Sequence, residues 1–409
     1  MPALCLYFQV HQPLRLKRYR VFDIGRDPHY FNDESDSNTN NIKVLHKVIQ
    51  KSYLPTTKIL FDLLQKYPQF KVSFSFSGVL LEQLEAHSPE TIALFQKLVK
   101  TKRVEILSET YYHSLSFLYS RDEFRSQVRL HQAKIKKLFK FTPRVFRNTE
   151  LIYNNELANV AESLGFDGIL AEGVDHILGW RSPNFLYSPP NCQKIKLLLK
   201  NYRLSDDIAF RFSSRDWPEY PLTAPKFTKW INQINGNGEV VNLFMDYETF
   251  GEHQWADTGI FDFLATLPGE ILRHPDNAFV TPSEAVVKFQ SRGELDIPNF
   301  ISWADIERDL SAWMGNPMQH DALRQLYDLE PKVLSTNNDE LITKWRRLQI
   351  SDHFYYMCTK WFSDGDVHKY FNPHNSPYEA FISFMNALQD LKLRIQQSSN
   401  TSPPSPLLN

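Results

Sequence analysis

Two carboxylates and a histidine follow one apolar run near the middle of the chain. Residues 240–245 are rich in β-branched and aromatic side chains, which is typical of a buried strand. Asp246 and Glu248 come directly after it, two residues apart, so both would lie on one side if the strand continued. His253 and Trp255 end the same stretch. These residue types can move protons and bind polar ligands, although an isolated Asp-x-Glu is also common in solvated loops.

Polar side chains follow four other apolar runs in the same way. These runs span residues 3–10, 104–107, 144–147 and 168–171. The polar residues at their ends are His11, Glu109, Glu150 and Glu172. In a barrel of alternating strands and helices, the carboxyl ends of the strands form the active site. Neighbouring carboxyl groups push each other's pKa values apart and so divide acid and base roles, and glycoside hydrolysis depends on such a pair.

The strands alternate with amphipathic helical patterns through the first 300 residues. Two further strands are predicted at residues 71–77 and 278–280, which brings the count to seven. This alternation predicts an α/β protein with a parallel sheet, either closed or open. A nucleotide-binding sheet is disfavoured, because residues 11–13 read His-Gln-Pro where a glycine-rich loop would follow the first strand.

The alternation is interrupted once and then ends. Residues 173–239 contain several prolines and read as an insertion, with a hairpin around residues 185–202 and a helix at residues 225–234. Beyond residue 300 the patterns are helical only. We therefore expect a catalytic unit over residues 1–300 with that insertion at about 173–239. A C-terminal helical region over residues 301–396 is expected to pack on it, and residues 397–409 to form a disordered tail.

The composition is that of a globular protein without a charged partner. The chain has 409 residues, of which 42% are hydrophobic and 23% charged, and its formal net charge is -1. This balance gives no electrostatic reason to expect nucleic acid or a membrane surface as partner. Cys5, Cys192 and Cys358 show no CxxC spacing, so neither a disulfide framework nor a zinc knuckle is indicated, and Cys358 is expected to pack in a core.

The beginning of the sequence and its aromatic content add two expectations. No basic leader precedes the first apolar run, which stops at His11, so a cytoplasmic location is predicted. Aromatic residues make up 14% of the chain, and flat amphipathic side chains suit sugars, which have one apolar face. No cofactor is expected, and the sequence carries no signal for an oligomeric state.

Five blocks, in order along the chain, resemble glycoside hydrolase family 57. They are residues 11–13, 105–113, 146–153, 245–253 and 348–356. The resemblance implies a retaining enzyme that acts on α-linked glucans, an incomplete (β/α)7 TIM-like barrel and a C-terminal helical region that contributes to the site. It also implies that Glu150, in the Arg-Asn-Thr-Glu block, is the nucleophile. Asp246, which opens the Asp-Tyr-Glu-Thr-Phe-Gly block, would be the general acid/base.

Other residues of these blocks are expected to bind the sugar or to support the pair. The predicted substrate-binding residues are His11, Glu109, His113, Glu248, His253, Trp255 and Asp352. We expect His11 to hydrogen-bond a sugar hydroxyl and Trp255 to stack on a glucose face. Glu248 and His253 are expected to orient Asp246.

Two more candidates depend on what surrounds them. Glu109 and His113 are four residues apart, so they would share a face if that segment were helical. They would then bind sugar or brace the catalytic pair. Asp352 is expected to reach the site from the helical region, although a charged residue within a helix is commonly solvated.

Three alternatives to an α-amylase acting on α-1,4 bonds remain open. A 4-α-glucanotransferase or a branching enzyme would use the same two carboxylates. A metal-dependent polysaccharide deacetylase could take His11, His113, Asp246 and His253 as ligands. However, it would need a His-x-x-x-His pair, and Phe117 stands four residues after His113. A glucan-binding protein without catalysis is the third.

Overall fold

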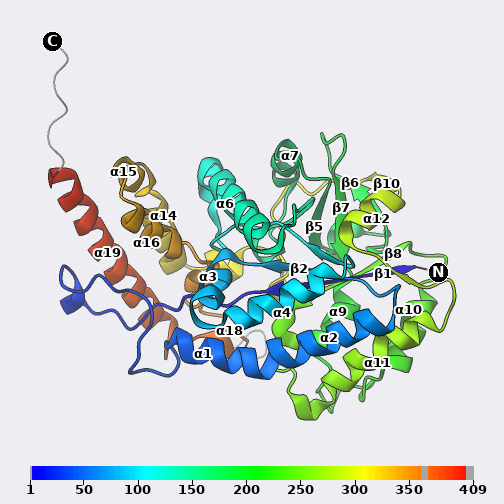
Figure 1. Cartoon of the computed structure of the whole chain (residues 1–409). Coiled ribbons are helices and arrows are strands. Elements are labelled where there is room, and N and C mark those ends of the chain that lie inside the picture. The colour runs from blue at the N-terminus through cyan, green and yellow to red at the C-terminus, as the bar shows by residue number, and fades with distance from the viewer. Residues whose placement is uncertain (1, 361–366, 402–409) are drawn as a thin grey trace. The chain divides into compact units, whose positions relative to one another are not determined.

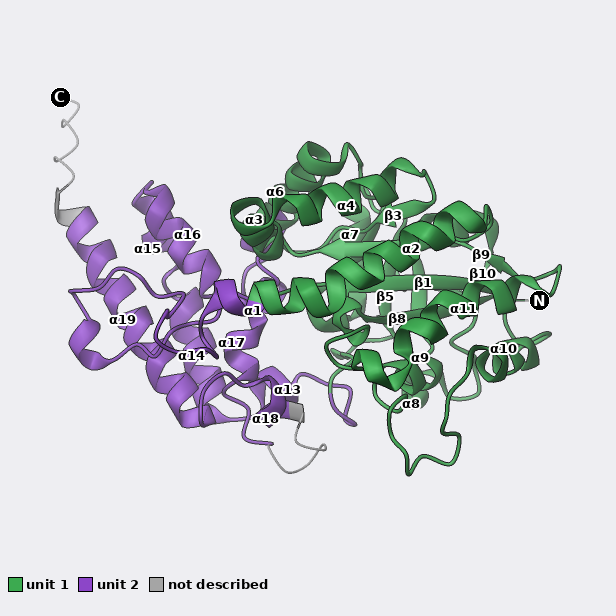
Figure 2. Cartoon of the chain, turned by 60° about the horizontal axis from the view of Figure 1, so that its bottom comes forward, with its two compact units in different colours: residues 1–12, 45–111, 126–304 green, residues 13–44, 112–125, 305–409 purple. Residues whose placement is uncertain are grey.

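The structure, a computed structural model, describes residues 2–360 and 367–401 (Figure 1). Its internal contacts divide the chain into two compact units (Figure 2). Unit 1 comprises Met1–Gln12, Leu45–Tyr111 and Ser126–Ala304, and unit 2 comprises Pro13–Val44, Tyr112–Arg125 and Asp305–Asn409. Of the tail predicted at residues 397–409, residues 402–409 lie outside the described residues.

Seven parallel strands follow one another around a barrel in unit 1. β8 pairs with β1, β1 with β2, and β2 with β3. A parallel bridge between Ser108 and Phe146 continues the order to β4, which pairs with β5, and β5 pairs with β7. The strands are β1 (Ala3–Val10), β2 (Val72–Phe76), β3 (Val104–Ile106), β4 (Val145–Arg147), β5 (Gly168–Glu172), β7 (Lys196–Lys200) and β8 (Val240–Asp246).

The barrel is incomplete between β7 and β8. No ladder joins these two strands in the described part of the chain. Instead, the backbone carbonyl of Asn242 accepts a hydrogen bond from the Asn201 amide at 2.9 Å. The Asn242 side-chain amide donates to the carbonyl of Leu199 at 2.9 Å. The incomplete seven-stranded TIM-like barrel implied by the sequence is therefore confirmed.

One strand of the barrel differs from the sequence prediction. β7 lies within residues 173–239, where a hairpin and a helix were expected but no strand of the barrel. The hairpin is present, because β6 (Leu186–Ser188) pairs antiparallel with β7 through Tyr187 and Leu197. However, β7 also pairs in parallel with β5 along its whole length. The strand predicted at residues 278–280 is β9 (Ala278–Phe279), which pairs only with the first residues of β1.

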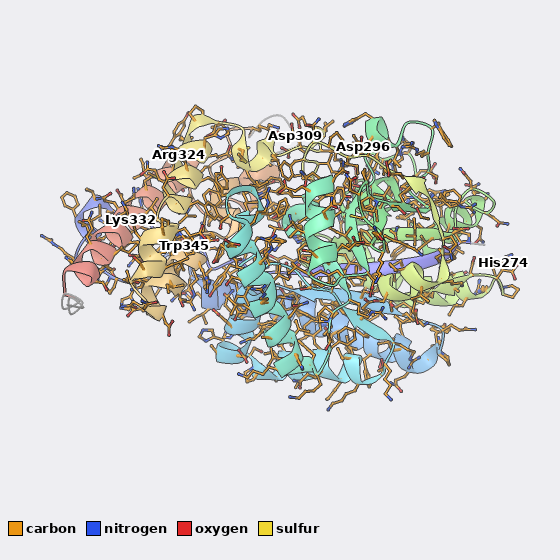
Figure 3. The ribbon with its side chains drawn as sticks, turned by 90° about the horizontal axis from the view of Figure 1, so that it is seen from above. His274, Asp296, Asp309, Arg324, Lys332 and Trp345 are labelled. Atoms are coloured by element: carbon orange, nitrogen blue, oxygen red, sulfur yellow. The ribbon has the colours of Figure 1, made fainter. Side chains whose placement is uncertain are left out.

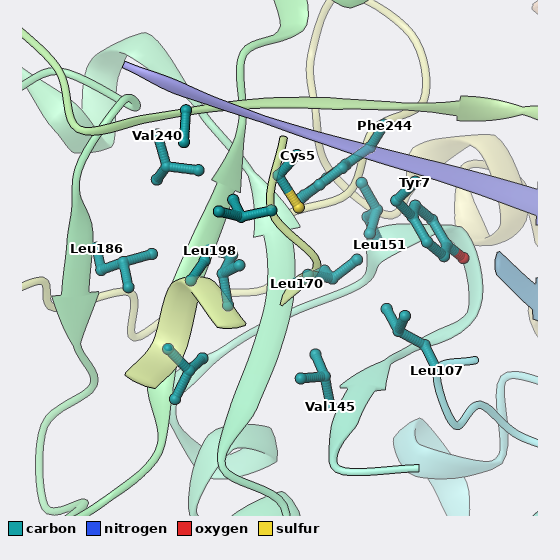
Figure 4. Packing of buried hydrophobic residues seen from close by; sticks show 14 residues of the cluster. Cys5, Tyr7, Leu107, Val145, Leu151, Leu170, Leu186, Leu198, Val240 and Phe244 are labelled. Carbon is teal, nitrogen blue, oxygen red and sulfur yellow. The ribbon is translucent and has the colours of Figure 1, made fainter. Parts of the chain in front are cut away.

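An apolar core occupies the interior of the barrel. Alternate residues of a strand face the same side, so Ala3, Cys5 and Tyr7 of β1 all contribute to this core (Figure 4). Val240 and Phe244 of β8 join them in the same alternation. In the same alternation, the next residue of β1 is Gln9 and the next residue of β8 after Phe244 is Asp246. The interior therefore changes from apolar to polar toward the carboxyl ends of the strands.

Helices connect the strands, as the alternation predicted. A capping box is present at Thr281, because Thr281 Oγ1 accepts from the Glu284 amide while the Glu284 carboxylate accepts from the Thr281 amide. The helix predicted at residues 225–234 is also present. The helices that lie wholly in unit 1 are α2 (Leu54–Lys66), α3 (Gly78–His87), α4 (Pro89–Lys100), α7 (Asn155–Ser163), α8 (Asp175–Leu178), α9 (Tyr202–Ala209), α10 (Ala224–Gln233), α11 (Ile260–Leu272) and α12 (Pro282–Lys288).

Unit 2 is helical after residue 305. Its helices there are α13 (Ser311–Met314), α14 (Pro317–Tyr327), α15 (Glu330–Ser335), α16 (Asp339–Arg347), α17 (Ser351–Tyr355), α18 (Val367–Phe371) and α19 (Pro377–Thr401). Trp345 of α16, labelled in Figure 3, is buried and donates its indole N–H to the Leu326 carbonyl at 2.9 Å. Residues 305–310, where the sequence predicts only helical patterns, are not helical, because Asp305 and Arg308 adopt left-handed φ values of 56° and 55°.

None of the helices in residues 2–360 and 367–401 is both long enough and apolar enough to cross a membrane.

Candidate active site

The acids that follow the barrel strands fall into two groups by exposure. Glu109, Glu172 and Glu248 are buried, with 4% or less of each residue exposed. Glu150 and Asp246 are partly exposed. A carboxylate must reach its substrate in order to react with it, so this difference separates the two predicted catalytic residues from the other acids.

Glu150 stands directly after β4 in an unusual backbone conformation. Its φ and ψ are 58° and 24°, which is the left-handed region that residues with a side chain rarely adopt. The backbone amide of Trp303 donates to the Glu150 carbonyl at 3.2 Å. The indole N–H of Trp303 donates to Glu150 Oε2 at 2.8 Å. Both the backbone and the carboxylate of Glu150 are thus held by one residue.

Asp246 is the last residue of β8, and the loop after it requires a glycine. It is aligned with Gln9 of β1 in the parallel ladder, which sets its height in the barrel. Further on, Gly251 has a φ of +105°, and a Cβ added there would lie 2.0 Å from the carbonyl oxygen of Lys51. Only glycine fits this position, which accounts for the glycine of the Asp-Tyr-Glu-Thr-Phe-Gly block.

Glu248 differs from Asp246 in its surroundings. Its carboxyl group is buried and accepts a hydrogen bond from the hydroxyl of Tyr53. Burial, followed by the nearby charge of Asp246, raises the pKa of Glu248 to about 8. Glu248 therefore carries a proton at neutral pH, and the Asp-x-Glu pair avoids two adjacent negative charges.

His253 and Trp255 lie on the loop after β8. The His253 backbone amide donates to the Glu248 carbonyl at 2.9 Å. Loss of water around the half-buried imidazole lowers the pKa of His253 to about 4, so the side chain is neutral at pH 7. Trp255 is 56% exposed, and the Lys51 ammonium lies 5.3 Å from its ring centroid. An exposed indole can accept the apolar face of a sugar.

Glu109 is fully buried in a polar network beneath the strand ends. Gln9 Nε2 lies 3.2 and 3.3 Å from the two carboxylate oxygens, and an Arg147 nitrogen lies 3.8 Å from one of them. The hydroxyls of Tyr7 and Ser75 each donate to Gln9 Oε1 at 2.7 Å, which fixes the orientation of that amide. Because Glu109 is buried in this network, it is suited to hold the side chains beneath the strand ends in place.

His11 follows β1 and is partly exposed. Its Nδ1 lies 2.6 Å from the hydroxyl oxygen of Ser77, the residue that follows β2. This hydrogen bond orients the imidazole from the neighbouring strand end. The contact of His11 with a substrate hydroxyl stays a prediction.

His113 and Asp352 belong to unit 2, where the structure brings their segments together. The Ser351 amide donates to the His113 carbonyl at 2.9 Å, and Ser114 forms an antiparallel bridge with Ile350. The segment between Glu109 and His113 is not helical, so the shared helical face considered for these two residues does not exist. His113 has a left-handed φ of 49° instead.

Sequence reasoning missed Lys200 and Trp303. Lys200 ends β7, and its ammonium lies 3.3 Å from Glu172 and 3.0 Å from Asp206. The other candidates were found because each is a polar residue at the end of an apolar strand. Lys200 also fits this description, but residues 196–200 were not recognised as a barrel strand. Trp303 lies 153 residues after Glu150 in the sequence, and no spacing connects the two.

In the described residues, no three His, Cys, Asp or Glu side chains come together in a way that could hold a metal ion. His11, Asp246 and His253, considered as ligands for a deacetylase, are thus not gathered into such a group.

Comparisons with known proteins agree with this reading. The sequence profile of Glycosyl hydrolase family 57 matches residues 5–298. A Methanocaldococcus jannaschii protein provisionally named an alpha-amylase is 44% identical over 401 residues, which cover 95% of this chain and 84% of that protein.

Two solved structures share the fold. One is the 4-alpha-glucanotransferase from Thermococcus litoralis, with a TM-score of 0.67 and 18% identity over 86% of this chain and 56% of that chain. The other is a GH57-type branching enzyme from Pyrococcus horikoshii, with a TM-score of 0.67 and 14% identity over 97% of this chain and 88% of that chain. The profile match, the M. jannaschii relative and the incomplete barrel agree: the chain belongs to glycosyl hydrolase family 57.

Proposed function

We propose that this glycoside hydrolase cleaves α-1,4-linked glucans with retention of configuration, with Glu150 as nucleophile and Asp246 as general acid/base. The observation that carries the proposal is the partial exposure of these two carboxylates among strand-end acids that are otherwise buried. The relatives support the substrate class, since the names of those compared above refer to α-glucan chemistry.

The reaction follows in two steps. The Glu150 carboxylate attacks the anomeric carbon and forms a covalent glycosyl-enzyme, while Asp246 donates its proton to the departing glycosidic oxygen. Asp246 then takes a proton from water, whose oxygen attacks the anomeric carbon and displaces Glu150. A retaining pair of this kind predicts a separation of about 5–5.5 Å between the two carboxyl groups.

Other residues support these two roles. Glu248, protonated and buried next to Asp246, adds no second negative charge at the acid/base, so Asp246 can alternate between its two forms. Orientation of His11 by Ser77 suits a fixed contact with a sugar hydroxyl. The exposed indole of Trp255 offers a stacking surface.

Sizing the products formed from maltooligosaccharides tests the function. Only shorter chains support the hydrolase, longer chains support a 4-α-glucanotransferase, and new branch points support a branching enzyme. Unchanged substrate in the presence of folded protein would contradict all three and favour a glucan-binding protein.

Small-anion rescue tests the two assignments separately. Replacement of Glu150 by Gln should lower kcat by on the order of 10³-fold or more, and replacement of Asp246 by Asn by about 10²–10⁴-fold. With α-maltosyl fluoride and azide, Glu150→Gly should give the β-azide, because azide attacks from the side that the carboxylate occupied. Asp246→Gly should give the α-azide through the intact glycosyl-enzyme. Exchange of these two stereochemical outcomes would overturn the assignment.

An α-glucan is the proposed partner. The cytoplasmic location read from the sequence stays a prediction, and cell fractionation followed by immunodetection of the protein tests it.

A further inference from the structure

Trp303 touches Glu150 at two points. Its indole Nε1 donates to Glu150 Oε2 at 2.8 Å, and its backbone amide donates to the Glu150 carbonyl at 3.2 Å. The first hydrogen bond fixes the direction of one carboxylate oxygen. The second restrains the left-handed backbone from which that carboxylate extends.

The segment that carries Trp303 is itself held firmly beside the Glu150 segment. Tyr153 and Ile301 exchange two backbone hydrogen bonds of 2.9 Å each. The Asn155 amide donates to the Ile297 carbonyl at 3.0 Å, and Asn155 Oδ1 accepts from the Ile297 amide at 2.9 Å. The indole also packs against the apolar core of the barrel. Trp303 is therefore a rigid donor and not a side chain free to rotate.

Two buried cations lie against the same indole. The Arg147 guanidinium carbon lies 4.9 Å from the Trp303 ring centroid, and Lys200 Nζ lies 5.5 Å from it. Arg147 and Lys200 are 0% and 4% exposed. None of the three guanidinium nitrogens of Arg147 has a hydrogen-bond partner among the described residues. A cation near the face of an indole draws electron density from the ring, which makes the ring N–H a stronger donor.

We propose that Trp303 is a positioning residue for the nucleophile, which aims the Glu150 carboxylate and keeps it ionised through an N–H strengthened by Arg147 and Lys200. The proposal rests on the role of Glu150 in the proposed function. An N–H donor stabilises the charged form of a carboxyl group over its protonated form. Only the charged form can attack the anomeric carbon.

Other charged groups surround this arrangement and remain in place in the test below. Glu109 lies 3.8 Å from Arg147, while Glu172 and Asp206 lie 3.3 and 3.0 Å from Lys200. Asp246 ends the strand that follows β7 around the barrel. These carboxylates offset part of the positive charge, so the indole N–H is the group expected to act on Glu150 directly.

The test compares pH profiles of kcat/KM for wild type and Trp303→Phe. Loss of the donor should lower kcat/KM roughly tenfold to a hundredfold with KM little changed, since a hydrogen bond to a charged group is removed. Because Glu150 is then protonated more easily, the acidic limb should move to higher pH by about one unit. Trp303→His places an imidazole Nε2 where the indole Nε1 was, so its acidic limb should move less.

Trp313→Phe is the matched control. Trp313 is also buried, but its indole nitrogen has no hydrogen-bond partner in the described residues. The substitution removes the same atoms without removing a bonded donor, so the acidic limb should stay at the wild-type pH. An acidic limb of Trp303→Phe that coincides with that of wild type, or a shift equal in both variants, overturns the proposal.

A second measurement separates this inference from the proposed function. Titration of the Glu150 carboxyl carbon by ¹³C NMR, assigned by its absence in Glu150→Gln, follows the ionisation of Glu150 without turnover. A transition at higher pH in Trp303→Phe supports the role of Trp303 even if wild type leaves maltooligosaccharides unchanged. An unchanged transition overturns that role even if wild type is an active hydrolase.

Discussion

Asp246 and Glu248 are two residues apart in the chain, and the fold gives them opposite surroundings. Asp246 is partly exposed at the end of β8, whereas Glu248 is buried against the hydroxyl of Tyr53. A buried carboxyl group that keeps its proton can hold a neighbouring acid/base in place without repelling its negative form. The supporting role that the sequence predicted for Glu248 thus has a physical basis in burial.

The protonated state of Glu248 has a consequence for stability against pH. Its pKa is raised from 4.5 to about 8 on folding, so the folded protein retains a proton that the unfolded chain releases between these values. The contribution of Glu248 to the free energy of unfolding of the wild type is therefore largest at low pH and decreases as the pH rises to about 8. Each pKa unit corresponds to about 1.4 kcal/mol. Glu248→Gln cannot titrate, so its free energy of unfolding should increase relative to wild type across this window.

Urea denaturation at pH 5, 6.5 and 8 measures the effect. Glu294→Gln, at an exposed glutamate, serves as the control and should follow wild type at each pH. Parallel curves for wild type and Glu248→Gln would mean that Glu248 is ionised in the folded protein.

At the residue scale, the sequence predicts the site residues that lie within short local blocks. It does not predict side chains that come to the site from distant parts of the chain. The strand-end pattern and the family resemblance carried by the five blocks together pointed to Glu150 and Asp246. Trp303 left no such trace, because a tryptophan in a loop after the last strand resembles any surface or core aromatic residue. Its contact with Glu150 exists only once the segments at residues 150–155 and 297–303 lie side by side.

At the scale of elements, β7 is a barrel strand that the hydrophobic pattern of the sequence does not identify by itself. Leu197, Leu198 and Leu199 form a short apolar run between Lys196 and Lys200. Such a run suits a strand buried on both faces, but periodicity alone does not separate it from a hairpin arm. The prolines before it suggested a loop-rich insertion. Its parallel partner, β5, is what makes it a barrel strand, and strand partners are not encoded locally.

A buried carboxylate is among the groups that link the long segment before α1 (Asn41–Val48) to α19. Asp390 is 0% exposed and accepts from the Gly25 amide at 2.6 Å, from the Tyr30 hydroxyl at 2.7 Å and from Arg394 at 2.5 Å. Asp390→Ala leaves buried donors without an acceptor and should lower the free energy of unfolding by about 2–4 kcal/mol.

A matched pair at the C-terminal end of α14 provides the control for Asp390→Ala. Asp328 pairs with Arg324 at 3.6 Å, with the same spacing of four residues, but both side chains are largely exposed. Asp328→Ala should change the free energy of unfolding by less than about 1 kcal/mol. Equal effects of the two substitutions in chemical denaturation would show that burial of Asp390 adds nothing.

At the scale of the whole molecule, the two units do not follow one another along the chain. Unit 2 takes residues 13–44 and 112–125 from the region covered by the family profile. Within unit 2, Glu123 pairs with Arg346 at 2.9 Å, and Ser120 donates to Glu330 at 2.8 Å. A chain that ends after the profile match would leave these early segments without their partners.

Truncation tests this interleaving. The fragment 1–304 should be unfolded or aggregated, as measured by circular dichroism and size-exclusion chromatography. It lacks Asp390 and Arg346, the bonding partners of the buried Tyr30 and Glu123. The fragment 1–401, which lacks only part of the tail that the sequence predicts to be disordered, should behave as the full chain does. A folded, monomeric 1–304 fragment would show that unit 1 is independent of unit 2.

The joint between β7 and β8 differs from the rest of the barrel in how its two strands are held together. Around the rest of the barrel, neighbouring strands are joined by ladders or a backbone bridge, and separating them breaks those backbone pairings. At this joint the described hydrogen bonds between the strands come from Asn242. Lys200 ends the strand on one side and Asp246 the strand on the other, so a small widening here would move the proposed proton carrier without breaking a ladder.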